Sequence, residues 1–179
     1  MKKIISVSIV LVFVLISSCS SRQSLQEYYV ANSESSNFLS LDIPTSILNL
    51  DTADLSATQK EALGALKKLN VLAFKKTTEN AAAFKIEKAK VKAILKSDKF
   101  IELMKMNTSY GKATVRYLGD ENVIDEVIIY GDNDDKGFVL IRVLGNKMNP
   151  AHLVQLLQAI QKSDYKGDGL EKLGDLIKG

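Results

Sequence analysis

The chain has 179 residues, with 24 lysines and arginines against 21 acidic residues, one histidine and one cysteine. A single histidine excludes a multi-histidine metal site, and a single cysteine excludes an internal disulfide. The nearly balanced charge argues against a nucleic-acid partner, which requires a strongly basic surface. The length suits one domain with a core of its own.

The amino terminus has the layout of a secretory signal peptide. Two lysines precede an apolar run over residues 4–16 that is too short for a stable membrane span. Two serines then stand before Cys19, an order of residues that resembles the lipobox of bacterial lipoproteins. This resemblance implies that residues 1–18 are removed and that Cys19 carries a diacylglycerol and further acyl chains such as palmitate. The alternative is an ordinary cleaved signal with an incidental cysteine.

The mature chain that this cleavage leaves is nearly neutral. It has 161 residues and a charge of +1, because the signal holds two of the basic residues and none of the acidic ones. Ser20 and Ser21 stand where an aspartate retains many lipoproteins in the inner membrane. By that analogy we expect a cell-envelope protein on the periplasmic face of the outer membrane, bound to the membrane through acylated Cys19.

Residues 19–37 are rich in serine, and we expect them to form a flexible tether. Tyr28 and Tyr29 lie within this segment. A short strand or turn packed on the domain edge suits them best, with a docking feature as the alternative.

The first half of the domain, which we place over residues 38–162, mixes strands and helices. Pro44 suits the first turn of a short helix to Leu50. Ser56 and Gln59 form a capping-box pattern, which predicts a helix ending near Leu69. The other elements expected here are a strand over residues 38–43, a buried strand over residues 71–74, a helix over residues 81–96 and a strand over residues 100–107.

The second half predicts an antiparallel meander. Its three runs rich in valine, isoleucine and aromatic residues are joined by short turns and cover residues 112–118, 123–130 and 138–144. If the last loop pairs Gly131 with Gly137, Glu126 falls opposite Arg142, where an opposite-charge pair contributes roughly 0.2–1 kcal/mol.

The carboxy-terminal part combines a helix and a tail. Asn149 and Pro150 supply an N-cap and a first-turn proline for an apolar helix through Ile160. Residues 163–179 form a tail with a short amphipathic segment, which docks on the domain or binds a partner or membrane.

The residue types that carry chemistry form no catalytic pattern, so we assign no catalytic, cofactor-binding or metal-binding residue and expect no cofactor. The acidic turn from Asp132 to Gly137 lacks the ligands of a calcium loop and suits a solvated hairpin. His152 suits a structural role, and Met104 and Met106 suit core packing. We read the lysines of the helix over residues 81–96 as a solvated face.

The order of the strand-like segments resembles that of small lipoproteins of the Bacteroidota that carry domain of unknown function 4252. The resemblance covers roughly residues 37–160. It lies in segments 38–43, 67–74, 96–104, 127–132 and 137–141. It implies a cell-envelope location and an α+β domain, and it brings no activity and no site residues.

Together these observations predict an α+β domain in which an antiparallel sheet with a C-terminal β-meander packs against two or three helices. We expect one sheet face to carry the helices and the other to be partly covered or used for binding. The leading function is a membrane-tethered binding or scaffolding module, with a protein of the envelope as a possible partner. The alternatives are an envelope enzyme that uses dispersed carboxylates and a regulatory lipoprotein that recruits a partner through its tail.

Overall fold

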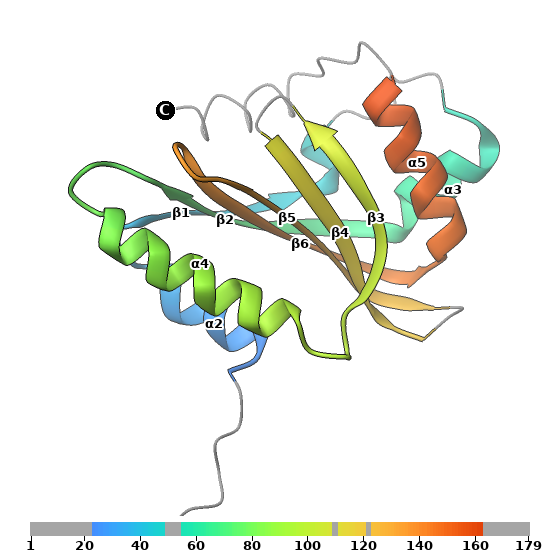
Figure 1. Ribbon diagram of the computed structural model, residues 1–179. Helices are drawn as coiled ribbons and strands as arrows, with labels where there is room; N and C mark the ends of the chain where they lie inside the picture. Colours follow the sequence, from blue (N-terminus) through green and yellow to red (C-terminus); the bar gives the residue numbers. More distant parts are fainter. Residues whose placement is uncertain (1–22, 49–54, 109–110, 121–122, 163–179) are drawn as a thin grey trace, which may run out of the picture.

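The computed structural model describes residues 23–48, 55–108, 111–120 and 123–162. Its strands form one six-stranded antiparallel sheet (Figure 1). In order across the sheet they are β1 (Phe38–Pro44), β2 (Leu66–Lys75), β6 (Gly137–Met148), β5 (Ile124–Asn133), β4 (Gly111–Gly119) and β3 (Ile101–Thr108). The last four strands along the chain are neighbours in the sheet, which confirms the predicted meander and the α+β class.

Helices cover both faces of this sheet, whereas we expected them on one. Helices α2 (Leu25–Asn32) and α4 (Ala81–Leu95) lie on one face, and α3 (Ala57–Ala65) and α5 (Pro150–Lys162) lie over one end of the other (Figure 1). We call these the α4 face and the α5 face. Both are apolar because the side chains of β2, β5 and β6 are largely apolar in both directions, so each face needs its own cover. No helix among the described ranges is both long and apolar enough to span a membrane.

The core on the α4 face is aromatic. Phe74 and Phe138, on adjacent strands, stack with their ring centroids 5.6 Å apart. Phe84 of α4 packs against both of them, and Tyr28 of α2 is fully buried beside them. These rings fix α4 diagonally across the sheet and leave β4, near the far edge, outside the main aromatic cluster.

The core on the α5 face is aliphatic. Val71, Val115 and Ile124 are fully buried there, and α5 inserts Leu153 and Leu156. Met104 and Met106 of β3 are partly buried against this cluster, which agrees with the expected packing role.

The segment before β1 differs from the predicted flexible tether. Leu25–Asn32 form α2, and Ser24 and Glu27 close a capping box at its start. Leu25, Tyr28 and Tyr29 are buried against the sheet. Serine-rich composition suggested a tether, but these three side chains bury enough apolar surface to order the helix. The tyrosine pair therefore belongs to a helix and not to a strand or turn.

Two predicted boundaries also shift. The capping box at Ser56 and Gln59 is present, but α3 ends at Ala65 and Leu66 already belongs to β2. Leu66 and Leu69 therefore pack from a strand, since pairing with β6 continues to that point. Pro44 ends β1, and the short helix expected there is a 3₁₀ turn over Thr45–Leu48. The predicted signal, Cys19 and the tail over residues 163–179 lie outside the described residues.

The register of the last hairpin differs from the one assumed in the sequence analysis. Asn133 pairs with Gly137, and Gly131 pairs with Val139, so Glu126 lies opposite Leu144. The Glu126–Arg142 ion pair nevertheless forms, because the two residues share the α4 face and are diagonal neighbours on adjacent strands.

Candidate functional site

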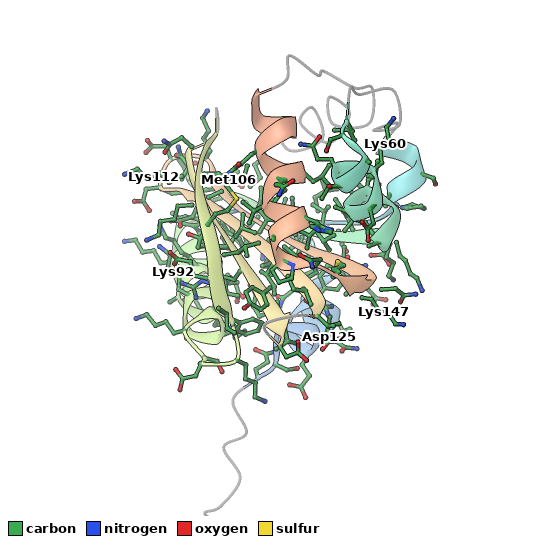
Figure 2. All side chains as sticks on the ribbon, turned by 90° about the vertical axis from the view of Figure 1, so that its right-hand side faces the viewer. Lys60, Lys92, Met106, Lys112, Asp125 and Lys147 are labelled. Atoms are coloured by element: carbon green, nitrogen blue, oxygen red, sulfur yellow. The ribbon has the colours of Figure 1, made fainter. Side chains whose placement is uncertain are left out.

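A hollow beside the carboxy-terminal half of α4 gathers basic side chains from two elements. This basic pocket has a volume of about 280 Å³. Its walls come from α4 and the residue after it, and from the adjacent strands β4 and β5. The lining residues are Lys92, Leu95, Lys96, Lys112, Thr114, Arg116, Ile128, Tyr130 and Asp132. Figure 2 shows Lys92 and Lys112 on the same side of the molecule, with Lys60 and Lys147 on the other.

Four cations line the basic pocket against one carboxylate. That carboxylate, Asp132, already has two partners: its Oδ2 lies 2.5 Å from Nζ of Lys88 and 3.2 Å from Nζ of Lys92. Lys88 also reaches Asp134, 2.6 Å away. Burial alone lowers the pKa of Lys88, but the two aspartates outweigh it and raise that pKa above its ordinary value. The acid is therefore neutralised, and the pocket is left with net positive charge.

Two buried polar atoms in the pocket walls have no hydrogen-bond partner among the described residues. They are the hydroxyl of Tyr130, a residue only 6% exposed, and Nε of Arg116. Arg116 directs Nη1 to the carbonyl of Leu95 and holds Nη2 3.8 Å from Glu102, so its side chain is fixed while Nε remains unused. Burial raises the pKa of Tyr130, and Asp132 raises it further through its charge and a weak hydrogen-bonding interaction, so this hydroxyl keeps its proton at neutral pH. A buried polar atom without a hydrogen-bond partner lowers the stability of the folded state unless a water molecule or a ligand bonds to it.

A second and larger hollow lies where the start of α2 meets the end of α4. We call it the ion-pair pocket; its volume is about 670 Å³. Glu126 and Arg142 line it, and they bond through Nε–Oε1 at 2.5 Å and Nη2–Oε2 at 3.0 Å. Leu25, Ile94 and Phe100 supply apolar walls.

The ion pair continues into a polar row under α2. Asn70 donates to the carboxylate of Asp42, and the hydroxyl of Tyr29 lies 2.9 Å from the same oxygen. The guanidinium of Arg142 lies over the Tyr29 ring, 5.9 Å from its centroid. Burial alone raises the pKa of Asp42, but hydrogen bonds from Asn70 and Tyr29, together with Lys68, lower it overall. The polar groups of this row bond to one another and connect α2 to the sheet.

The residues that the sequence singled out meet different outcomes. His152 in α5 lies 3.7 Å from Glu61 of α3, so it joins two helices. The acidic turn is the β5–β6 hairpin, as expected, and it supplies partners for α4 through Asp132 and Asp134. The lysines of α4 are not only a solvated face, because Lys88 and Lys92 are paired across to β5 and Lys92 and Lys96 line the basic pocket.

Sequence reasoning missed the basic pocket and the ion-pair pocket. The relevant signal was present in the alternation of β4, which places Lys112, Thr114 and Arg116 on one face. This alternation indicates a pocket only when the order of the strands is known, because that order places this face of β4 beside α4. In the described part of the chain, no three histidine, cysteine or acidic side chains gather to hold a metal ion. What the geometry can do is attract and hold an anionic group.

Comparison with known proteins identifies the family. The model of the family described as Domain of unknown function (DUF4252) matches residues 28–156, which include the end of α2, the whole sheet and the first half of α5. Searches of curated proteins and of solved structures found no match. Since the matched segment covers well over half of the chain, the protein belongs to the DUF4252 family.

Proposed function

We propose that this protein is a cell-envelope lipoprotein, anchored through acylated Cys19 on the periplasmic face of the outer membrane. The order of lysines, apolar run, small residues and Cys19 supports the anchor. The position of α2 fits the same arrangement, because this first described helix begins at Leu25, six positions after Cys19. Several acyl chains hold such a protein durably, since each buried methylene contributes roughly 0.8 kcal/mol.

At the membrane the protein acts as a binding module, with the α4 face as its binding surface. The observation that carries this proposal is the basic pocket, in which four cations and two unpartnered buried polar atoms surround a hollow. Rigid elements hold these groups: α4 is fixed by the aromatic core and β4 by pairing on both sides. Preorganised polar groups around a concave surface are typical of ligand sites.

The anchor is tested by substituting the cysteine. In cells fed an alkyne-labelled palmitate, Cys19→Ala should abolish labelling and move the protein out of the membrane fraction. Ser20→Ala, a change at the next position, should leave both labelling and fractionation unchanged. Labelling that persists in Cys19→Ala would contradict the anchor.

Binding is tested by thermal unfolding of the purified protein against panels of small anionic, cationic and neutral molecules. A ligand present at 100 times its Kd stabilises the folded state by about 2.7 kcal/mol, which raises Tm by roughly 5–10 °C for a chain of this size. We expect at least one chemical class to raise Tm in wild type and to lose this effect in Lys96→Gln/Lys112→Gln. If no class shifts Tm, the basic pocket is not a ligand site.

A further inference from the structure

We propose that the basic pocket binds a phosphoryl group, carried either by a small soluble phosphate ester or by a phospholipid headgroup. This inference rests on the proposed binding function and names the chemistry of its ligand. Its starting point is charge: the pocket is lined by Lys92, Lys96, Lys112 and Arg116, while its one acid, Asp132, is shared between Lys92 and Lys88, which lies outside the lining. An anion entering the pocket therefore meets uncompensated positive charge.

The kind of donor favours phosphate over carboxylate. Carboxylates are best recognised by the two parallel N–H groups of a free guanidinium fork. Arg116 cannot offer its terminal fork, because Nη1 donates to the Leu95 carbonyl and Nη2 faces Glu102. The pocket offers lysine point charges from several directions instead, together with the hydroxyls of Thr114 and Tyr130. Such an array suits a tetrahedral anion with several acceptor oxygens and more than one charge.

The free hydrogen-bonding groups fit the same ligand. The Tyr130 hydroxyl and Nε of Arg116 are buried donors with no acceptor at full hydrogen-bonding distance among the described residues, and the carboxylate of Asp132 interacts only weakly with that hydroxyl. Both belong to side chains that line the pocket, one from β5 and one from the neighbouring strand β4. A small side-chain rotation on ligand entry would give each donor a phosphoryl oxygen, and this would remove the cost of leaving it unpaired.

The size of the basic pocket limits the rest of the ligand. A volume of about 280 Å³ holds a phosphate with a few attached carbon and oxygen atoms and is too small for a folded partner segment. Leu95 and Ile128 give one part of the lining an apolar surface, which suits the carbons of a glycerol-like group.

Membrane headgroups are within reach of this pocket. Lys96 lines the basic pocket and also an adjoining hollow that contains Gln23, just before α2. From Cys19 to Leu25 an extended chain spans at most about 22 Å. Figure 1 shows the amino-terminal end of α2 beside the carboxy-terminal end of α4. An anchor at Cys19 would thus keep this end of the domain close to the membrane surface, where phosphate groups are abundant.

The test uses the mature chain, residues 19–179, with Cys19→Ala so that no acyl chain contributes. Titration calorimetry with glycerol 3-phosphate should show saturable binding at least about tenfold tighter than with glycerate, since the phosphoryl group accepts more charged hydrogen bonds than a carboxylate. Uncharged glycerol should not bind. In a second arm, sedimentation with vesicles of phosphatidic acid in phosphatidylcholine, against phosphatidylcholine alone, shows whether a headgroup can supply the phosphate.

Matched variants separate the pocket from general charge. Lys96→Gln/Lys112→Gln should weaken binding about tenfold or more. The control, Lys60→Gln/Lys147→Gln, removes the same charge on the opposite side of the molecule (Figure 2) and should retain wild-type affinity. Tyr130→Phe should weaken binding without loss of stability, which guards against a variant that merely unfolds. Far-ultraviolet circular dichroism confirms that each variant is folded.

The outcomes are distinct. Binding of glycerol 3-phosphate alone assigns a soluble ester, and vesicle binding that glycerol 3-phosphate displaces assigns a headgroup; either supports the inference. Equal losses in the pocket variant and the control, or no binding to either phosphate probe, overturn it. If the thermal panel identifies a ligand without phosphate at this pocket, the proposed binding function stands and this inference alone fails.

Discussion

Breaking the Glu126–Arg142 pair should destabilise the fold strongly, and this is the sharpest energetic prediction. The two side chains are only 11% and 9% exposed and are joined by two hydrogen bonds. Arg142→Met leaves a carboxylate buried beside an apolar side chain, which should cost about 3–5 kcal/mol. For a chain of this size the corresponding fall in Tm is roughly 6–20 °C.

A double-mutant cycle separates the pair from its surroundings. Glu126→Leu alone should be similarly costly, because it strands the guanidinium under the Tyr29 ring. The double variant Glu126→Leu/Arg142→Met should recover most of the loss, since no unpaired charge remains.

Urea unfolding followed by circular dichroism gives the free energies of the cycle. A large cost is expected because the pair, although it lines the ion-pair pocket, is shielded from most of the surrounding water. Single substitutions that each cost less than about 1 kcal/mol, the range of exposed pairs, would refute that expectation.

Single substitutions at Tyr130, Gly137 and Asp42 test other parts of the structure. Tyr130→Phe should leave the free energy of unfolding unchanged or slightly raised in the absence of ligand, because it removes a buried hydroxyl that has no partner at hydrogen-bonding distance. A loss above about 1 kcal/mol in urea unfolding would mean that the hydroxyl is hydrogen-bonded in solution. Gly137→Ala should cost more than about 2 kcal/mol by the same assay, because the φ of Gly137 is +127° and a Cβ there would overlap the carbonyl of Phe74. The control is Gly64→Ala on α3, which should not destabilise the protein because a Cβ at that position meets no other atom. The pKa of Asp42 is lowered below its ordinary value of 3.8, so its stabilising contribution is fully present above pH 3.8 and is lost as the pH falls through the lowered pKa. The difference in unfolding free energy between wild type and Asp42→Asn should therefore be constant from pH 5 to 8 and shrink in more acidic solution. A difference that grows on acidification would contradict this sign.

Local chemistry made part of this fold predictable. The capping box at Ser56 and Gln59 and the cap at Asn149 are present, because each depends on residues within a few positions of one another. The meander was predictable because turn residues separate its strands at short intervals. The end of α3 was not, since Leu66 and Leu69 suit a helix locally and β6, far away in the sequence, pairs them as a strand.

Tertiary packing decided the remainder. The capping box at Ser24 and Glu27 is a local signal for α2, but the order of this short helix also depends on burial of Tyr28 and Tyr29 against a sheet formed later in the chain. The basic pocket is a product of the same kind, because Lys96 and Lys112 approach it from different elements. A lysine-rich helix alone predicts a solvated face, and only its placement across β5 and toward β4 turns part of that face into a pocket wall.

Native mass spectrometry of the protein, extracted from its own membrane in mild detergent, tests the acyl anchor and the basic pocket together. We expect a chain that begins at Cys19 and carries acyl groups, with a fraction bound to a small phosphorylated molecule. The variant Lys96→Gln/Lys112→Gln should lack this molecule, and Lys60→Gln/Lys147→Gln should retain it. A chain with an unmodified Cys19, or one that carries no such molecule in any form, would contradict the account of a membrane-tethered anion-binding module.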